Sequence, residues 1–126
     1  MEIKVKQTKM KALIFQAPGQ IEIVEKTIPV PGPTDALIRI TTTTICGTDV
    51  HILKGEYPVK AGITIGHEPV GTIEALGVAV TGYQLGQRVI SGAITPCGQC
   101  HPCLEGTHSQ CGGNAFKPTG PSAYSY

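Results

Sequence analysis

Residues 34–55, TDALIRITTTTICGTDVHILKG, carry the clearest secondary-structure pattern in the chain. The first half lacks Gly and Pro and is rich in Thr and Ile, which favour strands, so we expect a strand over residues 35–44. Gly47 and Gly55 bracket the second half and leave room for about two helical turns over residues 48–54. The centre of the expected fold is therefore a strand that passes into a short helix at Cys46.

Outside this stretch, Gly and Pro interrupt the chain at short intervals. The sequence contains 16 Gly and 10 Pro among 126 residues, and both residue types break helices. Apolar or alternating runs predict further short strands at residues 11–15, 21–26, 70–76 and 87–90. We therefore expect a mostly β domain of short strands, and the composition excludes a helical bundle.

Length and charge narrow the functional class. A chain of 126 residues accommodates one domain, and a formal net charge of +1 provides no electrostatic basis for binding nucleic acid or an anionic membrane. The sequence has no apolar run of the ~18 residues that a membrane span needs, and the polar residues 1–6 do not resemble a signal peptide. We therefore expect a cytoplasmic protein with neither nucleic-acid nor membrane partners.

Four of the five cysteines lie within fifteen residues, with the spacing C-x2-C-x2-C-x7-C, at Cys97, Cys100, Cys103 and Cys111. The odd cysteine count and a reducing cytoplasm argue against disulfides. Four thiolates suit a tetrahedral Zn²⁺ with no open position. We therefore predict a structural zinc site in a cysteine lobe over residues 96–113, where the metal stabilises a segment too poor in apolar residues to form its own core.

An iron–sulfur cluster is the competing interpretation of the same cysteines. The ferredoxin pattern also begins C-x2-C-x2-C, but its fourth Cys follows after three residues and precedes Pro. Here seven residues separate Cys103 from Cys111, and Gly112 follows, so the spacing favours zinc. His101 and His108 lie inside the lobe, and because four sulfurs are present we interpret both as exposed loop residues.

A second set of metal-binding residue types lies outside the lobe. Cys46 follows the expected strand 35–44, and His67 and Glu68 precede the expected strand 70–76. Cys, His and a carboxylate at strand ends are suitable ligands for a zinc ion with an open position. Alone, Cys46 is typical of a small buried apolar residue and His67 of a loop histidine. Their occurrence together, beside a four-Cys lobe, favours a second zinc site.

The order of the motifs resembles the zinc-dependent medium-chain alcohol dehydrogenases. The motifs are CGTDVH (46–51), GHEPVG (66–71), GQRV (86–89) and the cysteine lobe. The resemblance implies a GroES-like, partly open β-barrel with short helices over residues 10–126, an incomplete catalytic domain that includes the lobe. Residues 1–9 would then be an N-terminal extension.

The resemblance also assigns roles to individual residues. It makes Cys46 and His67 ligands of a catalytic zinc, and Glu68 either a ligand or a close neighbour. Asp49 would be the carboxylate that orients the ring of His67, which fixes its tautomer and raises its basicity.

Two further catalytic roles fall on the residues after Cys46. By the same resemblance, Thr48 hydrogen-bonds the substrate oxygen and His51 passes the proton toward solvent, as suits a side chain that titrates near neutral pH. Without the resemblance, Thr48 is typical of a helix N-cap, Asp49 of a first helical turn and His51 of a solvated helix face.

The implied activity is that of an oxidoreductase that converts a small primary or secondary alcohol to an aldehyde or ketone, with hydride transfer to NAD or NADP. The sequence has no G-x-G-x-x-G fingerprint, so we expect the nicotinamide-binding Rossmann domain to be absent and this chain alone to be inactive. The family's third catalytic-zinc ligand has no counterpart here, and residues 112–126 have loop composition. The alternative is a non-catalytic, zinc-stabilised truncated module that self-associates or binds a partner. For either function, the sequence is compatible with a homo-oligomer.

Overall fold

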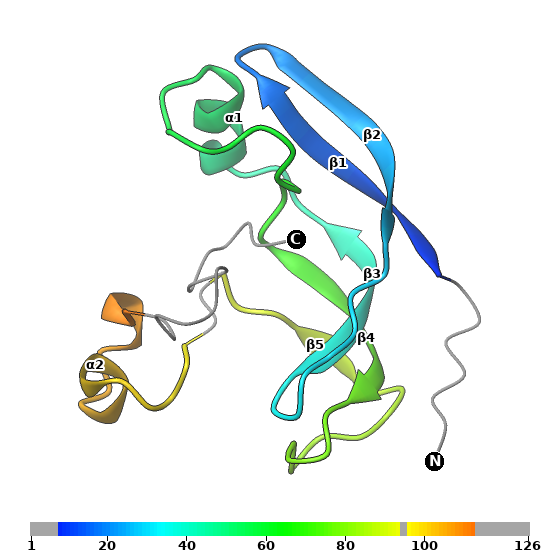
Figure 1. Ribbon diagram of the computed structural model, residues 1–126, viewed down its shortest axis with the longest axis vertical. Helices are drawn as coiled ribbons and strands as arrows, with labels where there is room; N and C mark the ends of the chain where they lie inside the picture. The colour runs from blue at the N-terminus through cyan, green and yellow to red at the C-terminus, as the bar shows by residue number, and fades with distance from the viewer. Residues whose placement is uncertain (1–7, 94–95, 113–126) are drawn as a thin grey trace.

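The computed structural model describes residues 8–93 and 96–112. Most of the predicted extension at residues 1–9 and of the loop-like segment at 112–126 lies outside the described residues. The elements follow the order β1 (Lys9–Ala17), β2 (Gln20–Thr27), β3 (Ala36–Thr43), α1 (Gly47–Leu53), β4 (Pro69–Leu76), β5 (Arg88–Ile90), α2 (His101–Leu104) and the 3-10 helix η1 (His108–Gln110) (Figure 1).

The strands form two antiparallel sheets. One is the hairpin β1–β2, and the other has the order β3-β4-β5. Gly19 closes the hairpin with φ +76°, a conformation that favours glycine. On β4 the side chains of Ile73 and Ala75 are buried, and the intervening Glu74 is exposed, which is the period of a strand with one covered face.

The buried apolar residues come from the hairpin, α1 and β4. Ile52 of α1 is fully buried, and the remaining buried apolar side chains of the strands are Ala12, Ile14, Phe15, Ile73 and Ala75. Helix α1 is also bonded to the hairpin turn, because the Gly19 N–H donates to the Leu53 carbonyl at 2.7 Å. The core therefore fixes α1 against the end of the hairpin, where Figure 1 shows it.

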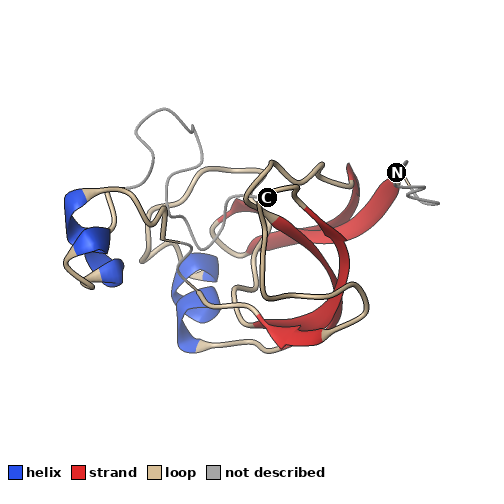
Figure 2. Ribbon diagram, turned by 90° about the horizontal axis from the view of Figure 1, so that it is seen from below, coloured by secondary structure: helices blue, strands red, loops and turns tan. Residues whose placement is uncertain are grey.

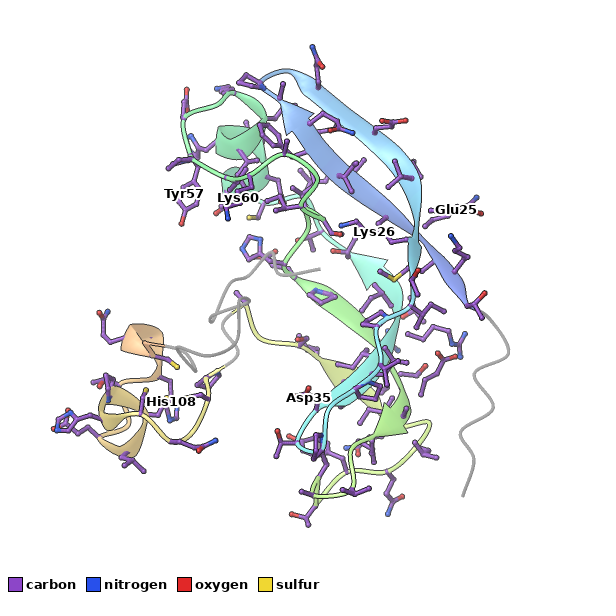
Figure 3. All side chains as sticks on the ribbon, in the orientation of Figure 1. Glu25, Lys26, Asp35, Tyr57, Lys60 and His108 are labelled. Carbon is purple, nitrogen blue, oxygen red and sulfur yellow. The ribbon has the colours of Figure 1, made fainter. Side chains whose placement is uncertain are left out.

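The segment that leads to His67 is held by the free edge of β1. The Phe15 N–H donates to the Ile63 carbonyl at 3.0 Å, and the Ile65 N–H donates to the Leu13 carbonyl at 2.9 Å. Lys26 of β2, labelled in Figure 3, adds side-chain bonds from Nζ to the Gly62 carbonyl and to Thr64 Oγ1. These contacts carry the chain from α1 back to the start of β4.

The predicted mostly β fold is confirmed. Each strand and the helix α1 lie where the sequence predicted them, with ends displaced by at most two residues. Every strand pair among the described residues is antiparallel. No helix in the described part of the chain is long and apolar enough to span a membrane.

The short helices α2 and η1 were not predicted, because both lie in the Gly-, His- and Pro-rich lobe. Four and three residues respectively are too few to show a helical periodicity. Figure 2 shows both helices on one side of the molecule, away from the strands.

We predict that Gly71→Ala lowers the free energy of unfolding by about 1–3 kcal/mol, the usual range for overpacking. Gly71 is buried in β4, and an added Cβ would lie 2.3 Å from the Arg39 carbonyl oxygen and 2.7 Å from Ile38 Cγ2 of β3. Urea denaturation measures the change. Gly47→Ala is the matched control, because an added Cβ there meets nothing within 4 Å. Equal stability of the two variants would contradict close β3–β4 contact at Gly71.

Candidate metal centres

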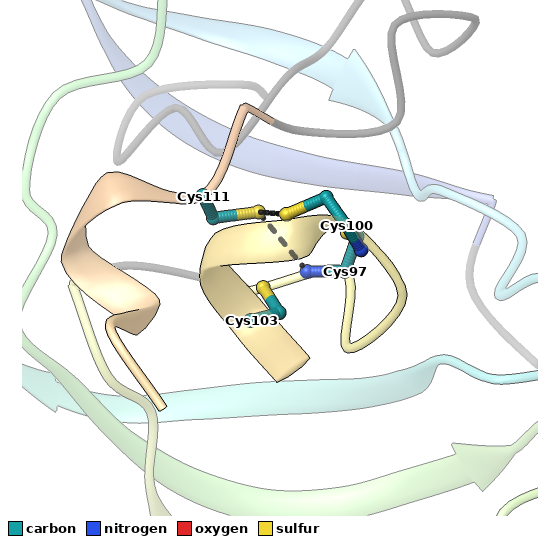
Figure 4. Close-up of side chains that lie close together, drawn as sticks. All are labelled: Cys97, Cys100, Cys103 and Cys111. Atoms are coloured by element: carbon teal, nitrogen blue, oxygen red, sulfur yellow. Dashed lines mark hydrogen bonds between the residues drawn. The ribbon is translucent and has the colours of Figure 1, made fainter. Parts of the chain in front are cut away.

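The four cysteines of the lobe converge on one point. The sulfurs of Cys97, Cys100, Cys103 and Cys111 all lie within 4.8 Å of one another (Figure 4), and all four thiols are free. Cys103 and Cys111 are buried, whereas Cys97 and Cys100 are half-buried. Four sulfurs at this separation form a donor set that fits a tetrahedral zinc ion.

Backbone groups of the lobe orient the sulfurs. Gly98 has φ +72°, and this turn brings the N–H groups of Gln99 and Cys100 to within 3.5 Å and 3.4 Å of Cys97 Sγ. The Cys97 N–H in turn donates to Cys111 Sγ at 3.3 Å. These N–H groups therefore stabilise negative charge on the sulfurs, and the same hydrogen bonds would stabilise thiolates that bind a metal.

The thiols differ in acidity for physical reasons. The N–H groups of Gln99 and Cys100 lower the pKa of Cys97 to about 6, and the N–H of Cys103 lowers the pKa of Cys100. Burial raises the pKa of Cys103 to about 12. Zinc binds the deprotonated thiol, so the lowered pKa values of Cys97 and Cys100 favour the form that binds zinc. Cys103, whose pKa is raised, is the ligand that most needs the charge of the cation.

The two histidines of the lobe are exposed, as predicted, although both belong to short helices rather than to loops. His101 begins α2, and its Nδ1 lies 3.2 Å from Glu105 Oε2. His108 begins η1 and is labelled on the lobe in Figure 3. Neither residue belongs to the group of four sulfurs that could hold a metal ion.

We predict that Cys103→Ser removes one equivalent of zinc from the protein and unfolds the lobe, because three sulfurs leave a buried cation incompletely ligated. Elemental analysis measures the zinc, and the loss of amide protection in residues 96–112 measures the unfolding. His108→Ala is the control and should keep its full zinc content. Equal losses in the two variants would refute a four-sulfur site.

The predicted second set also comes together, and we call it the three-donor cluster: Cys46, His67 and Glu68. One ligand atom from each lies within 4.8 Å of the others, and Cys46 Sγ is 3.7 Å from His67 Nε2. The cause is the register of the second sheet, in which Thr43 of β3 pairs with Pro69 of β4. The residues that follow β3 and those that precede β4 therefore meet at the same end of the sheet.

Helix α1 begins at the cluster, and its N-cap is Cys46. Cys46 Sγ accepts from the Thr48 N–H at 3.3 Å, and the Asp49 carboxylate accepts from the Cys46 N–H at 2.9 Å. The Asp49 N–H also donates to the Cys46 side chain, and this bond and the Cys46 N–H···Asp49 bond form a capping box, in which Asp49 is buried with 7% exposure. The interpretation of Thr48 as the N-cap is wrong, because the helix begins at Gly47 and its N-cap is Cys46.

Two residues at this centre were missed by the sequence interpretation. The Thr44 hydroxyl donates to the Glu68 carboxylate, and Glu56 Oε2 lies 2.5 Å from His51 Nδ1. A run of four threonines offers no signal that distinguishes Thr44, because only the pairing of β3 with β4 decides which hydroxyl faces Glu68. Thr48 and His51 are three residues apart on α1 and so occupy the same side of the helix.

The sequence matches the alcohol dehydrogenase GroES-like domain over residues 32–125. The chain belongs to this family. It is 58% identical over 120 residues to an alcohol dehydrogenase of Cupriavidus necator, a match that covers 87% of this chain and 33% of that protein. It is 45% identical over 107 residues to an L-threonine 3-dehydrogenase of Stenotrophomonas maltophilia, covering 81% of this chain and 32% of that protein.

Solved structures agree with the family assignment. The alcohol dehydrogenase TADH from Thermus sp. ATN1 superposes with a TM-score of 0.77 at 34% identity, over 82% of this chain and 30% of that one. Acetophenone reductase from Geotrichum candidum, in complex with NAD, superposes with a TM-score of 0.80 at 27% identity, over 92% and 35%. The predicted GroES-like fold is confirmed, and the chain spans about a third of the length of the curated relatives that it matches.

The two donor sets of this GroES-like domain fit zinc in different ways. The cysteine lobe offers four sulfurs, which fill a tetrahedral shell. The three-donor cluster offers one sulfur, one imidazole nitrogen and one carboxylate, and three protein donors leave one tetrahedral position for another ligand. The first set therefore has the chemistry of a structural site and the second that of a reactive one.

We predict that Thr44→Val weakens zinc binding at the three-donor cluster by about 10–100-fold, the usual effect of removing a group that hydrogen-bonds a metal ligand. The hydroxyl holds the exposed Glu68 carboxylate, and valine keeps the shape without the donor. Zinc competition with a chromophoric chelator measures the affinity, and Thr44→Ser should restore it.

Thr42→Val is the matched control for this measurement. Thr42 belongs to the same threonine run and lies near the end of β3, but the hydroxyl that bonds the Glu68 carboxylate is that of Thr44. An unchanged zinc affinity in Thr44→Val would show that the carboxylate does not depend on this bond.

Proposed function

We propose that this chain is the catalytic-domain portion of a zinc-dependent, NAD(P)-dependent alcohol dehydrogenase that oxidises a small primary or secondary alcohol to an aldehyde or ketone. The observation that carries the proposal is the convergence of Cys46, His67 and Glu68 at one end of the second sheet. Membership of the GroES-like alcohol dehydrogenase family supports it. The higher identity to an alcohol dehydrogenase than to threonine dehydrogenases favours a simple alcohol.

Cys46, His67 and Glu68 would hold the catalytic zinc, and the four cysteines of the lobe would hold the structural one. When bound at the three-donor cluster, zinc supplies Lewis acidity that makes a hydroxyl group far more acidic, as it does for water, whose pKa falls from ~15.7 to ~7. NAD(P) supplies the hydride acceptor, and we expect a part of the protein outside these 126 residues to bind it.

The residues of α1 would transfer the proton that the alcohol releases to water. Thr48 lies two residues after Cys46, and its half-buried hydroxyl both accepts and donates a hydrogen bond. It would accept from the substrate hydroxyl and donate along the same side of the helix toward His51. His51 is 61% exposed, so its ring would deliver the proton to water. Asp49 supports this arrangement because its carboxylate holds the Cys46 backbone.

The structural lobe would contribute to stability rather than to chemistry. Its four sulfurs form a closed set. Cys103 is the one buried residue of α2 and η1, and the next buried residue, Cys111, directly follows η1. The lobe thus has no apolar core of its own among the described residues, and metal binding would supply the folding free energy that a core otherwise provides.

The decisive experiment fuses this chain to the C-terminal two-thirds of the Cupriavidus necator relative and measures alcohol-dependent reduction of NAD and NADP. We expect activity in the fusion, and loss of at least about 100-fold in its His67→Ala variant, since even partners outside the ligand shell cost about 10–100-fold. The His67→Ala fusion should retain the zinc of the lobe and lose the other equivalent. His101→Ala is the control and should keep both.

Two results would contradict the proposal. One is a folded fusion that binds both zinc equivalents but oxidises no alcohol, and the other is full activity in the His67→Ala fusion. The first would favour the alternative of a non-catalytic, zinc-stabilised module.

A further inference from the structure

The C-terminal end of α1 has a defined backbone geometry. Gly55 has φ +76°, and its N–H donates to the Ile52 carbonyl at 2.9 Å, while the Glu56 N–H donates to the His51 carbonyl at 2.9 Å. These two bonds, one inside the other, are the Schellman motif that ends many helices. The motif places residue 56 directly over residue 51 of the last turn.

The position of this helix end is also fixed by the hairpin. An added Cβ at Gly55 would lie 2.8 Å from Cγ of Pro18 in the β1–β2 turn. The next residue of that turn, Gly19, donates its N–H to the Leu53 carbonyl. Residue 55 must therefore be glycine both for its φ and for this close approach, and the relation between His51 and Glu56 depends on the fold rather than on a flexible loop.

The side chains at this motif form an unusual pair. The two residues that the motif brings together usually make an apolar contact, but here His51 Nδ1 lies 2.5 Å from Glu56 Oε2. The two side chains are 61% and 53% exposed. An ion pair at this exposure contributes little to stability, so a stabilising role does not account for it.

The contact determines where the ring of His51 carries its proton. A carboxylate is an acceptor only, so Nδ1 must be the donor in this bond. In the neutral imidazole the other nitrogen, Nε2, is then the bare acceptor. A side chain that is to receive a proton needs that form, because a ring protonated at Nε2 presents a donor toward the incoming proton.

We propose that Glu56 is a positioning residue that holds neutral His51 in the Nδ1–H tautomer and so keeps Nε2 ready to accept a proton. The proposal rests on the proposed function in one respect, the role of His51 at the end of the proton path. The tautomer itself is a property of the chain that requires neither zinc, alcohol nor NAD(P).

The test is long-range ¹H–¹⁵N NMR of the imidazole rings in the full chain, at a pH of about 9, where an ordinary histidine is neutral. The unsubstituted chain should show His51 protonated at Nδ1. Glu56→Met keeps the length of the side chain without an acceptor, and it should shift His51 to a mixture in which Nε2–H is substantially populated. The backbone bonds of the helix end remain available in this variant, and unchanged hydrogen-exchange protection of the amides of Gly55 and residue 56 would verify them.

A second exposed pair supplies the matched control. His101 and Glu105 make an Nδ1–carboxylate contact of 3.2 Å on the lobe. Glu105→Met should leave the His51 tautomer unchanged, and Glu56→Met should leave that of His101 unchanged. The proposal is overturned if His51 is protonated at Nε2 in the unsubstituted chain, or if Glu56→Met leaves its tautomer as it was. Because His51 is not a metal ligand, loss of zinc binding would defeat the proposed function without altering this result.

Discussion

The antiparallel pairing of β3 with β4 is the constraint on which the three-donor cluster depends. Cys46 and His67 are 21 residues apart in the sequence, and neither lies in a strand. They meet because Thr43 pairs with Pro69, so the chain leaves β3 and enters β4 at the same edge. Two residues after Pro69, Gly71 lets β3 and β4 approach each other closely. A slip in register by one residue would separate the donors.

The two candidate metal centres arise from different parts of this architecture. In the cysteine lobe all four sulfurs come from fifteen consecutive residues, and short turns bring them together. The three-donor cluster depends instead on long-range pairing and on the segment that β1 holds through Ile63 and Ile65. The lobe can therefore form its donor set locally, whereas the cluster forms only when both sheets have folded.

Helix α1 connects the core to the three-donor cluster, and each of its ends is defined by a local capping motif. At its start, Cys46 is the N-cap and also a member of the three-donor cluster, and Asp49 completes the capping box. At its end, the Schellman motif sets Glu56 against His51. Ile52, fully buried between these ends, anchors the helix in the core. The seven-residue helix α1 is therefore held at both ends and at Ile52, and this fixes the backbone positions of Thr48 and His51.

Local patterns in the sequence determined the strands, the helix after Cys46 and the four-sulfur set, because strand propensity, glycine breaks and ligand spacing act over a few residues. The motifs also indicated Cys46, His67 and Glu68 as donors, although their spacing alone says nothing of distance. Tertiary structure decided that Cys46, not Thr48, caps α1, and that Thr44 and Glu56 bond to Glu68 and His51. Those contacts depend on strand register and on the left-handed turn at Gly55 packed against Pro18. Both are set by packing between segments distant in sequence, which no local pattern encodes.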